Sequence, residues 1–256
     1  MKFAIFTKTD KDVSKQYQMV EQAAKNASFT FDNENPDVVF VLGGDGTLLK
    51  AVQRYIDIVD NIKFVGFRCG NLGFFYDFNE EDIDRVINEL GKNEFIERTY
   101  HLLECEIDDK KVYAVNEIRF ERPFHSVSCV VSVNNEELES FRGDGLVVSS
   151  VLGSSGYSKS IGGAVIDHSI EVLQLNEIAA IQNNLYKSIG SPLLLNKESV
   201  ISFKGKLNNI LLGYDHKIIE CQEVNTIKVK YSAKKICLVF DKKHNGLTSI
   251  RRSFVK

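Results

Sequence analysis

The sequence lacks features that mark several whole classes of protein. No apolar run approaches the roughly 20 residues that a membrane-spanning helix needs. The first residues, Met1–Thr7, lack the long apolar region and cleavage site of a signal peptide. A net charge of −3 and the absence of a long basic run argue against a nucleic-acid surface. We therefore expect a cytoplasmic protein whose partners include neither membrane nor nucleic acid.

Cysteine is sparse and scattered. The five cysteines stand singly without a Cys-x-x-Cys pair, so the sequence signals neither a zinc site nor a disulfide framework. Their expected role is that of small buried apolar residues. No cluster of carboxylates demands a dedicated metal cage either, so we expect no metal bound by protein ligands alone.

The composition that remains is that of an ordinary soluble globular protein. Its 256 residues, 43% hydrophobic and 26% charged, suffice for one or two domains with ample core. In the first part of the chain, expected strands alternate with expected helices, which predicts a Rossmann-like parallel sheet covered by helices. The expected strands are 3–8, 37–42 and 61–67, and the expected helices are 13–26, 47–58 and 80–90.

The pattern changes near Phe95. From there to Phe240 short β-branched runs follow one another, which predicts an antiparallel, sandwich-like all-β domain. One stretch, Glu171–Ala180, fits either a helix or irregular structure. We place an α/β domain at 1–98, with the tail 241–256 returning to it, and a β-rich domain at 99–240. The expected strands are 102–107, 111–116, 127–133, 145–150, 200–203, 218–220, 226–230 and 236–240.

The most informative stretch is the turn Gly43-Gly44-Asp45-Gly46-Thr47, which lies between a buried strand and a helix. Glycines there let the backbone approach a ligand, and the helix start offers N–H groups and a positive dipole end to phosphate. Asp45 would repel phosphate, which suggests that it has another task. The alternative is a glycine-rich turn that only redirects the chain. The Gly-Lys-Ser/Thr ending of a Walker A loop is absent.

Two further stretches admit both a structural and a functional interpretation. The glycine cluster Gly66–Phe75 is either a loop with aromatic core anchors or a second wall of the same crevice, with Phe74 or Phe75 packing on a ring. Asn116 and Glu117 end an expected strand. They are either solvated, or they pair with a ribose diol and a base.

The stretch Arg142–Ala164 concentrates glycine, hydroxyl groups and one tyrosine around a single strand. Backbone donors, hydroxyls and an aromatic face together suit a nucleoside. Asp144 in this stretch is equally compatible with a buried acid whose oxygens accept loop N–H groups.

Taken in this order, these motifs resemble those of the NAD kinase family, in its bacterial form. The resemblance rests on the first turn, Gly70–Phe74, Asn116-Glu117 and Gly143–Gly163, and extends to Gly190–Leu193 and Asp215-His216. The first turn alone is shared with diacylglycerol kinases, sphingosine kinases and phosphofructokinases. The combination is highly specific and covers nearly the whole chain.

The resemblance implies that the protein phosphorylates the 2′-hydroxyl of the adenosine ribose of NAD with ATP, giving NADP and ADP. It implies Asp45 as general base, Mg²⁺ or another divalent cation on ATP, and a homotetramer. Gly43, Gly44, Gly46 and Thr47 would lie near the phosphates, and Asn116 and Glu117 would contact the adenosine. Phe74 and Tyr157 would pack on rings. The other residues that it assigns to the dinucleotide site are Arg142, Asp144, Ser155, Gly156, Ser158, Lys159, Ser160, Ala179 and His216.

The chain departs from the family pattern in one segment. The usual Ser-Thr-Pro-Thr-Gly-Ser-Thr-Ala-Tyr is here Ser149–Tyr157, so Val151 and Leu152 replace a proline and a threonine, and Gly156 replaces an alanine. A rigid φ and a hydroxyl are lost, and the backbone before Tyr157 is loosened. Two other functions stay open: a lipid kinase, because it would share the first turn, and a catalytically silent NAD(P)-binding sensor, which the altered segment allows.

Overall fold

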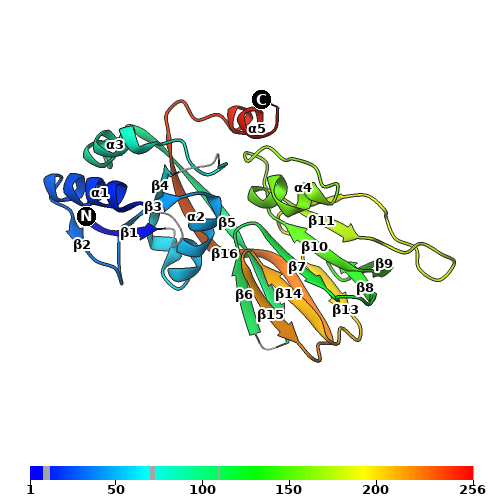
Figure 1. Ribbon diagram of the computed structural model, residues 1–256. Coiled ribbons are helices and arrows are strands. Elements are labelled where there is room, and N and C mark those ends of the chain that lie inside the picture. The colour runs from blue at the N-terminus through cyan, green and yellow to red at the C-terminus, as the bar shows by residue number, and fades with distance from the viewer. Residues whose placement is uncertain (8–11, 70–72, 109, 256) are drawn as a thin grey trace. The chain divides into compact units, whose positions relative to one another are not determined.

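The structure, a computed structural model, describes residues 1–7, 12–69, 73–108 and 110–255 (Figure 1). The chain divides into two compact units. The first comprises Met1–Tyr100 and Lys234–Lys256, and the second comprises His101–Ala233.

The first unit contains a parallel sheet with helices packed on it. Its strands run in the order β2-β1-β3-β4, and the C-terminal end of β16 pairs in parallel with β4 through Cys237 and Leu238. This confirms the expected parallel, helix-covered sheet. The strands are β1 (Lys2–Thr7), β2 (Thr30–Phe31), β3 (Val38–Gly43), β4 (Lys63–Arg68) and β16 (Thr226–Asp241). The helices are α1 (Ser14–Asn26), α2 (Asp45–Arg54), α3 (Ile83–Glu89) and α5 (Gly246–Phe254), with 3-10 turns η1 (Val59–Asn61) and η2 (Glu80–Asp82).

Strand β3 is buried along its whole length, as expected for a central parallel strand that is covered on both faces. Its side chains alternate between the faces, so Phe40 joins a core with residues of α1 and α3. The rings of Phe3, Phe40, Phe67 and Phe78 follow one another through this core with centroids 6.1 to 6.2 Å apart. Figure 1 shows α1 and α3 side by side, and the two helices are in contact. The end of β3, where the glycine turn begins, is thus fixed by a packed core.

The second unit is built from two antiparallel β layers. One layer contains β5 (Phe95–Ile107), β6 (Lys110–Ala114), β8 (Val127–Val133), β9 (Glu136–Gly143), β13 (Ile201–Lys204) and the first part of β16. The other has the order β12-β11-β10-β7-β14-β15. Its strands are β7 (Glu117–Glu121), β10 (Gly145–Ser149), β11 (Val172–Ile178), β12 (Leu193–Asn196), β14 (Ile210–Tyr214) and β15 (Lys217–Cys221). The short helices η3 (Leu152–Ser155) and α4 (Tyr157–Ser160) follow β10.

The two layers share one apolar core. Phe120 of β7 and Phe203 of β13 are fully buried, and their rings meet edge to face with centroids 4.9 Å apart. This arrangement confirms the expected antiparallel, sandwich-like fold. The tail also behaves as expected, because α5 belongs to the first unit.

Several local expectations were wrong. The stretch Glu171–Ala180 is neither helical nor irregular but contains β11, in which Leu173 and Leu175 face the core while Gln174 and Asn176 face the other way. The runs 226–230 and 236–240 form one long strand, β16. Helix α2 begins at Asp45 rather than Thr47. Strands β7, β9, β12 and β14 and helix α5 were not predicted.

The pair Asn116-Glu117 does not end a strand. Strand β6 ends at Ala114, and Glu117 is the first residue of β7. Val115 and Asn116 therefore form a bend between the two strands, in which backbone groups pair with neighbouring loops, and Glu117 begins the second strand.

Candidate active site

In the first unit, the glycine turn connects β3 to α2 under tight steric limits. Gly43 is the last residue of β3, Gly44 caps α2, and Asp45 is the first helical residue. A Cβ on Gly43 would lie 2.2 Å from the hydroxyl oxygen of Thr47, so only glycine fits there. The Gly44 N–H donates to that hydroxyl at 3.4 Å, and the Thr47 N–H donates to the Gly44 carbonyl at 2.7 Å. Thr47 is buried and holds the turn, while Gly46 is exposed.

The carboxylate of Asp45 is held by backbone donors from the second glycine cluster. Oδ2 accepts the Phe74 N–H at 2.9 Å, and Oδ1 accepts the Phe75 N–H at 3.3 Å. A Cβ on Gly73 would lie 2.4 Å from Oδ1, so Gly73 leaves room for the carboxylate. Gly70, Asn71 and Leu72 of the same cluster lie outside the described residues.

The surroundings of Asp45 both raise and lower the pKa of its carboxyl group. Burial raises the pKa of its carboxyl, while the N–H groups of Phe74 and Phe75 and the positive charge of Arg68 lower it. The net result is a pKa above the ordinary value. The hydroxyl of Tyr76 donates to the Gly44 carbonyl at 2.9 Å, which ties the same segment to the turn.

In the second unit, the bend at Asn116 and Glu117 is fixed from three sides. Asp215 accepts the N–H groups of Val115 and Asn116, each at 2.8 Å from its nearer oxygen. The Ser150 N–H donates to the Asn116 carbonyl at 2.8 Å. A Cβ on Gly153 would lie 2.1 Å from that carbonyl oxygen, so η3 packs directly on the bend.

Two acceptor atoms of this bend have no partner. Oδ1 of Asn116 and Oε2 of Glu117 are buried, and no described residue donates a hydrogen bond to either. Burial, and then the negative charge of Asp215, raise the pKa of Glu117 to about 7, against the lowering effect of Arg119. Buried polar atoms without a partner are uncommon in folded proteins and call for an explanation such as a ligand or water.

Tyr157 stands next to this bend with a fixed ring. The guanidinium carbon of Arg119 lies 4.5 Å from the ring centroid, a cation–π distance. The hydroxyl of Tyr157 donates to Oε1 of Glu121 at 3.4 Å. Neither Arg119 nor Glu121 was singled out from the sequence, because their relation to Tyr157 depends on the pairing of β7 and not on spacing along the chain.

The remaining residues of Ser155–Ser160 differ in environment. The hydroxyl of Ser158 is buried; it donates to Oδ1 of Asn176 at 3.0 Å and accepts from Nε2 of Gln174 at 2.7 Å. The Ser155 hydroxyl donates to the Leu152 carbonyl at 3.5 Å. Gly156, Lys159 and Ser160 are exposed. A Cβ on Gly156 would lie 3.8 Å from Oε2 of Glu117, so this glycine adjoins the unpartnered acceptor.

Arg142, Asp144 and Ala179 come together where β9, β10 and β11 meet. The Asp144 N–H donates to the Ile178 carbonyl at 2.9 Å, and the Arg142 side chain donates to the Ser126 hydroxyl at 3.1 Å. Asp144 is exposed, so its alternative interpretation as a buried acid was wrong. Ala179 adopts a left-handed backbone with φ of 48° and is exposed. His216 is exposed in the turn between β14 and β15.

Comparison with known families shows to which family this chain belongs. The family model of the ATP-NAD kinase N-terminal domain matches residues 4–95, and that of the C-terminal domain matches residues 116–241. The chain belongs to the ATP-NAD kinase family. NAD kinase 1 of Oceanobacillus iheyensis is 34% identical over 263 residues, which cover 100% of this chain and 98% of the relative. NAD kinase of Leuconostoc citreum is 31% identical over 260 residues, again covering 100% and 98%.

Solved structures share the fold of this ATP-NAD kinase family member. A yeast NADH kinase complexed with NADH matches with a TM-score of 0.85 at 19% identity, covering 100% of this chain and 87% of the other. An NAD kinase from Archaeoglobus fulgidus in complex with ATP matches with a TM-score of 0.78 at 24% identity, covering 100% and 98%. At these identities the likeness concerns the fold.

Neither a cluster of metal-ligating side chains nor a membrane-spanning helix is found in the described part of the chain. Within residues 1–7, 12–69, 73–108 and 110–255, no group of three or more His, Cys, Asp or Glu side chains is arranged to hold a metal ion. No helix in the same part of the chain is long and apolar enough to span a bilayer.

Proposed function

We propose that the protein is an NAD kinase that transfers the terminal phosphoryl group of ATP to the 2′-hydroxyl of the adenosine ribose of NAD, giving NADP and ADP. Membership of the ATP-NAD kinase family across both domains supports this activity, as do the names of its relatives. The observation that carries the proposal is the carboxylate of Asp45, which two backbone N–H groups hold at the start of α2.

Asp45 acts as the general base. As the ribose oxygen forms its bond to the γ-phosphorus, the carboxylate takes the proton of the 2′-hydroxyl, and the bond from phosphorus to the ADP oxygen breaks. A pKa above the ordinary value makes Asp45 a stronger proton acceptor than an exposed aspartate. The N–H groups of Phe74 and Phe75 fix the direction of the carboxylate, which limits the search for a reactive geometry. Phe74 also offers a ring face to the substrate.

The glycine turn places backbone close to the phosphates. Gly43, Gly44 and Gly46 carry no side chain that would keep a phosphate away, and the start of α2 contributes N–H groups and a positive dipole end. These partial charges offset the repulsion between Asp45 and phosphate that the sequence alone left as a conflict. Thr47 maintains the turn through its hydrogen bonds to Gly44.

The second unit recognises the nucleoside. Hydroxyl or amine hydrogens of the adenosine would satisfy the unpartnered acceptors of Asn116 and Glu117. Tyr157, held by Arg119, offers its free face to a ring of the dinucleotide. The residues that complete the dinucleotide site in this proposal are Arg142, Asp144, Ser155, Gly156, Ser158, Lys159, Ser160, Ala179 and His216.

A divalent cation, Mg²⁺ or a similar ion, accompanies ATP in this proposal. Such an ion would be held mainly by phosphate oxygens and water. When bound, such an ion neutralises charge on the phosphates that would otherwise oppose attack by the ribose oxygen.

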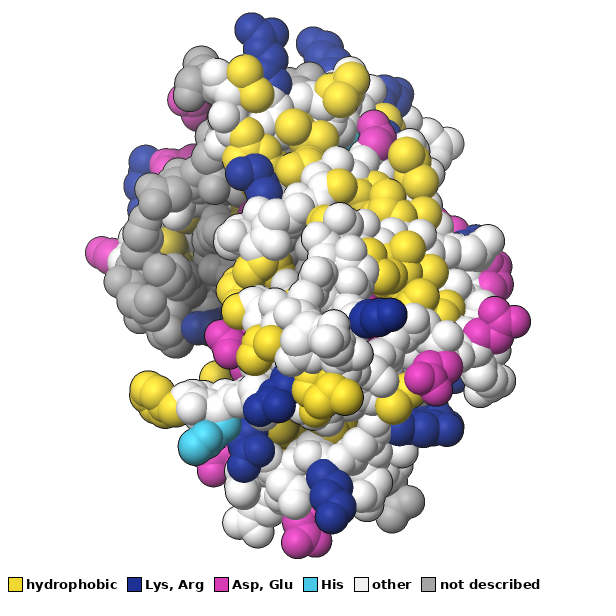
Figure 2. All heavy atoms as spheres, turned by 90° about the vertical axis from the view of Figure 1, so that its right-hand side faces the viewer, with side chains coloured by type: hydrophobic (Ala, Val, Ile, Leu, Met, Phe, Trp, Pro, Cys, Tyr) yellow, Lys and Arg dark blue, Asp and Glu magenta, His cyan; other side chains and the backbone are white. Residues whose placement is uncertain are grey.

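We also propose a cytoplasmic homo-oligomer, and a tetramer by resemblance. Large apolar side chains are exposed in the second unit, among them Leu185 at 81% and Ile170 at 53%. On the face drawn in Figure 2, apolar side chains gather between interspersed Lys, Arg, Asp and Glu side chains. Apolar side chains gathered on a surface favour association with another protein, here a second copy.

The deciding experiment measures NADP formation by the full-length protein with Mg²⁺ and ATP, and compares Asp45→Asn with the parent chain. Loss of about a thousandfold or more in kcat, with nucleotide binding and thermal unfolding preserved, is expected if Asp45 is the base. Near-normal turnover by Asp45→Asn would remove the base assignment. Phosphorylation of diacylglycerol or sphingosine in place of NAD would favour a lipid kinase. Tight NADP binding without ADP release would favour a silent sensor.

A further inference from the structure

The segment Gly73–Phe78 makes contacts on two sides within the first unit. On one side it holds the glycine turn: Phe74 and Phe75 donate to the carboxylate of Asp45, and the Tyr76 hydroxyl donates to the Gly44 carbonyl at 2.9 Å. These three bonds come from consecutive residues. The position of the Asp45 carboxylate therefore depends on where this short segment lies.

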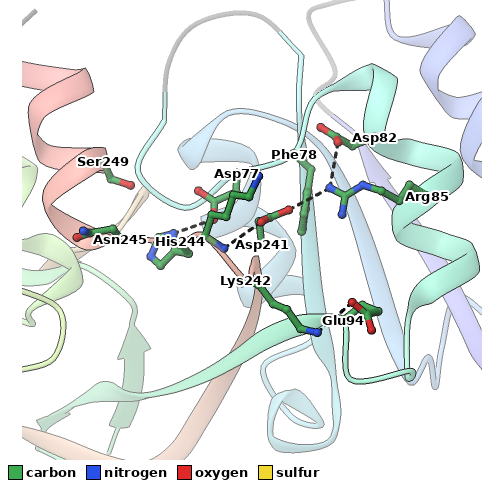
Figure 3. A pocket seen from close by; sticks show the side chains of 11 residues that line it. Asp77, Phe78, Asp82, Arg85, Glu94, Asp241, Lys242, His244, Asn245 and Ser249 are labelled. Carbon is green, nitrogen blue, oxygen red and sulfur yellow. Dashed lines mark hydrogen bonds and ion pairs between the residues drawn. The ribbon is translucent and has the colours of Figure 1, made fainter.

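On its other side the same segment is held by the end of the chain. Oδ2 of Asp77 lies 2.7 Å from Nδ1 of His244, close enough for a strong hydrogen bond in which the imidazole donates. The ring of Phe254 in α5 lies 5.1 Å from the ring of Phe74. In Figure 3 the His244 ring points toward Asp77, beside a cavity of about 450 Å³.

The side chain of His244 is buried within the first unit. Its side chain is 1% exposed, and its ring stacks on Phe240 with centroids 4.0 Å apart. Nε2 is buried and has no hydrogen-bond partner among the described residues, so the bond to Asp77 is the specific polar contact of this ring. A buried imidazole loses its hydration, so it is stable here only if the bond that remains is well formed.

We propose that His244 and Phe254 are positioning residues for catalysis: they fix the segment Gly73–Phe78, which in turn aims the carboxylate of Asp45. This inference rests on the proposed role of Asp45 as general base. The end of the chain thereby becomes part of the catalytic apparatus without touching the substrate.

Two other cationic side chains near this path, those of Arg85 and Lys242, form ion pairs. In the cavity beside His244, Arg85 pairs with Asp82 and Asp241, each at about 3 Å, and Lys242 pairs with Glu94 at 2.9 Å (Figure 3). The cavity is also lined by Lys243. The Arg85 guanidinium also lies over the ring of Phe78, 5.9 Å from its centroid, so Arg85 touches the segment. Lys242 is paired with Glu94, outside the segment, which makes Lys242 a suitable control position.

Release of the segment has a distinctive consequence for pH dependence. Asp45 faces Arg68 from β4, the hydroxyl of Tyr76, and the N–H groups of Phe74 and Phe75. If the two N–H groups withdraw, the carboxylate loses donors that favour its charged form, and its pKa rises further. The acid limb of the kcat profile then moves to higher pH. A loss of stability alone would not move that limb.

The test compares three variants of the full-length protein in the NADP-forming assay. His244→Phe keeps a ring against Phe240 but removes the donor to Asp77, whereas His244→Asn keeps an N–H donor close to the position of Nδ1. Lys242→Ala breaks the pair with Glu94 at the same end of β16. We expect His244→Phe to lower kcat about tenfold and to raise the acid limb by about half a pH unit, with KM values changed less than about twofold. His244→Asn should restore most of kcat, and Lys242→Ala should match the parent.

An acid limb that stays in place in His244→Phe would overturn the inference, whatever happens to stability. If His244→Phe does not fold, Phe254→Ala decides the question, because it acts on the same segment through Phe74. An acid limb raised in Phe254→Ala supports the inference, and an unmoved one overturns it. Asp45→Asn separates the two proposals. Near-normal activity of Asp45→Asn would contradict the role of Asp45 as general base. An inactive Asp45→Asn together with an unaffected His244→Phe would contradict only the positioning role of His244.

Discussion

The carboxylate of Asp215 accepts the backbone N–H groups of two successive residues, with Oδ1 lying 2.8 Å from the nitrogen of Asn116 and Oδ2 lying 2.8 Å from that of Val115. Asp215 itself adopts a left-handed backbone with φ of 51°. The turn between β14 and β15 thus clamps the bend that carries Asn116 and Glu117. An aspartate suits both demands, because its short side chain tolerates positive φ and accepts several hydrogen bonds.

Two substitutions of Asp215 should therefore show how much its accepted hydrogen bonds contribute to the stability of the protein. Asp215→Ala removes the acceptor and places a residue with a Cβ but no compensating bond at positive φ, so we expect a loss of about 2–4 kcal/mol in the free energy of unfolding. Asp215→Asn keeps one acceptor oxygen and tolerates the backbone, so its loss should be about half as large. Urea denaturation of the two variants measures the difference. Losses close to zero in both variants would mean that the clamp contributes little to stability.

Stability should fall as pH rises from about 5 to 7.5. Burial raises the pKa of Glu117 to about 7, and burial together with the neighbouring Glu177 raises that of Glu139 to about 7. Each group binds its proton more tightly in the folded state than in the unfolded chain. The folded state is therefore favoured below the ordinary carboxyl range, and this advantage is lost as pH rises toward the folded-state pKa.

Glu117→Gln should remove part of that pH dependence. An amide has no proton to lose in this range, so we expect the free energy of unfolding at pH 7.5 to exceed that of the parent by on the order of 1–3 kcal/mol, with little change at pH 5. Glu136→Gln, at an exposed position of β9, is the matched control. Guanidinium unfolding at the two pH values provides the comparison. A slope between pH 5 and 7.5 identical to that of the parent would refute the assignment.

Gly153 and Gly156, in the segment that departs from the family pattern, should respond differently to alanine. A Cβ on Gly156 would meet its nearest neighbour, the Gly153 carbonyl oxygen, at 3.4 Å, which is an ordinary contact distance. Gly156→Ala should therefore change the free energy of unfolding by less than about 1 kcal/mol. A Cβ on Gly153 would lie 2.1 Å from the Asn116 carbonyl oxygen, so Gly153→Ala should cost about 2 kcal/mol or more. Thermal unfolding of both variants tests this, and similar effects would contradict the packing of η3 on the bend.

Arg119 should influence NAD affinity through Tyr157. Removing the guanidinium 4.5 Å from the ring centroid frees the ring, so Arg119→Ala should raise KM for NAD about five- to tenfold with a smaller change in KM for ATP. Tyr157→Phe keeps the ring and removes the hydroxyl with its long bond to Glu121, and should change KM for NAD less than about threefold. Steady-state kinetics with each substrate varied in turn is the measurement. A larger effect from Tyr157→Phe than from Arg119→Ala would show that the hydroxyl, not the ring, matters.

Local pattern was enough for much of the fold. The all-apolar run of β3 and the glycines that follow predicted a buried strand that ends in a turn, and both are found because burial and backbone freedom are properties of those residues themselves. The same reasoning gave a wrong prediction for Glu171–Ala180, which contains strand β11. Its polar Gln174 and Asn176 are buried in β11 because they meet Ser158, a partner that sequence spacing does not reveal.

The sequence by itself determined that Asp45 stands at a strand-to-helix turn among glycines, because three glycines, one acid and one hydroxyl are contiguous there. Only the tertiary structure decided what holds its carboxylate. The donors, Phe74 and Phe75, lie 29 and 30 residues further along the chain, and His244 bonds to their neighbour Asp77 across 167 residues. Contacts at such separation depend on how the sheet and the tail pack, and the free energy of that packing is shared among many residues rather than written in any one motif.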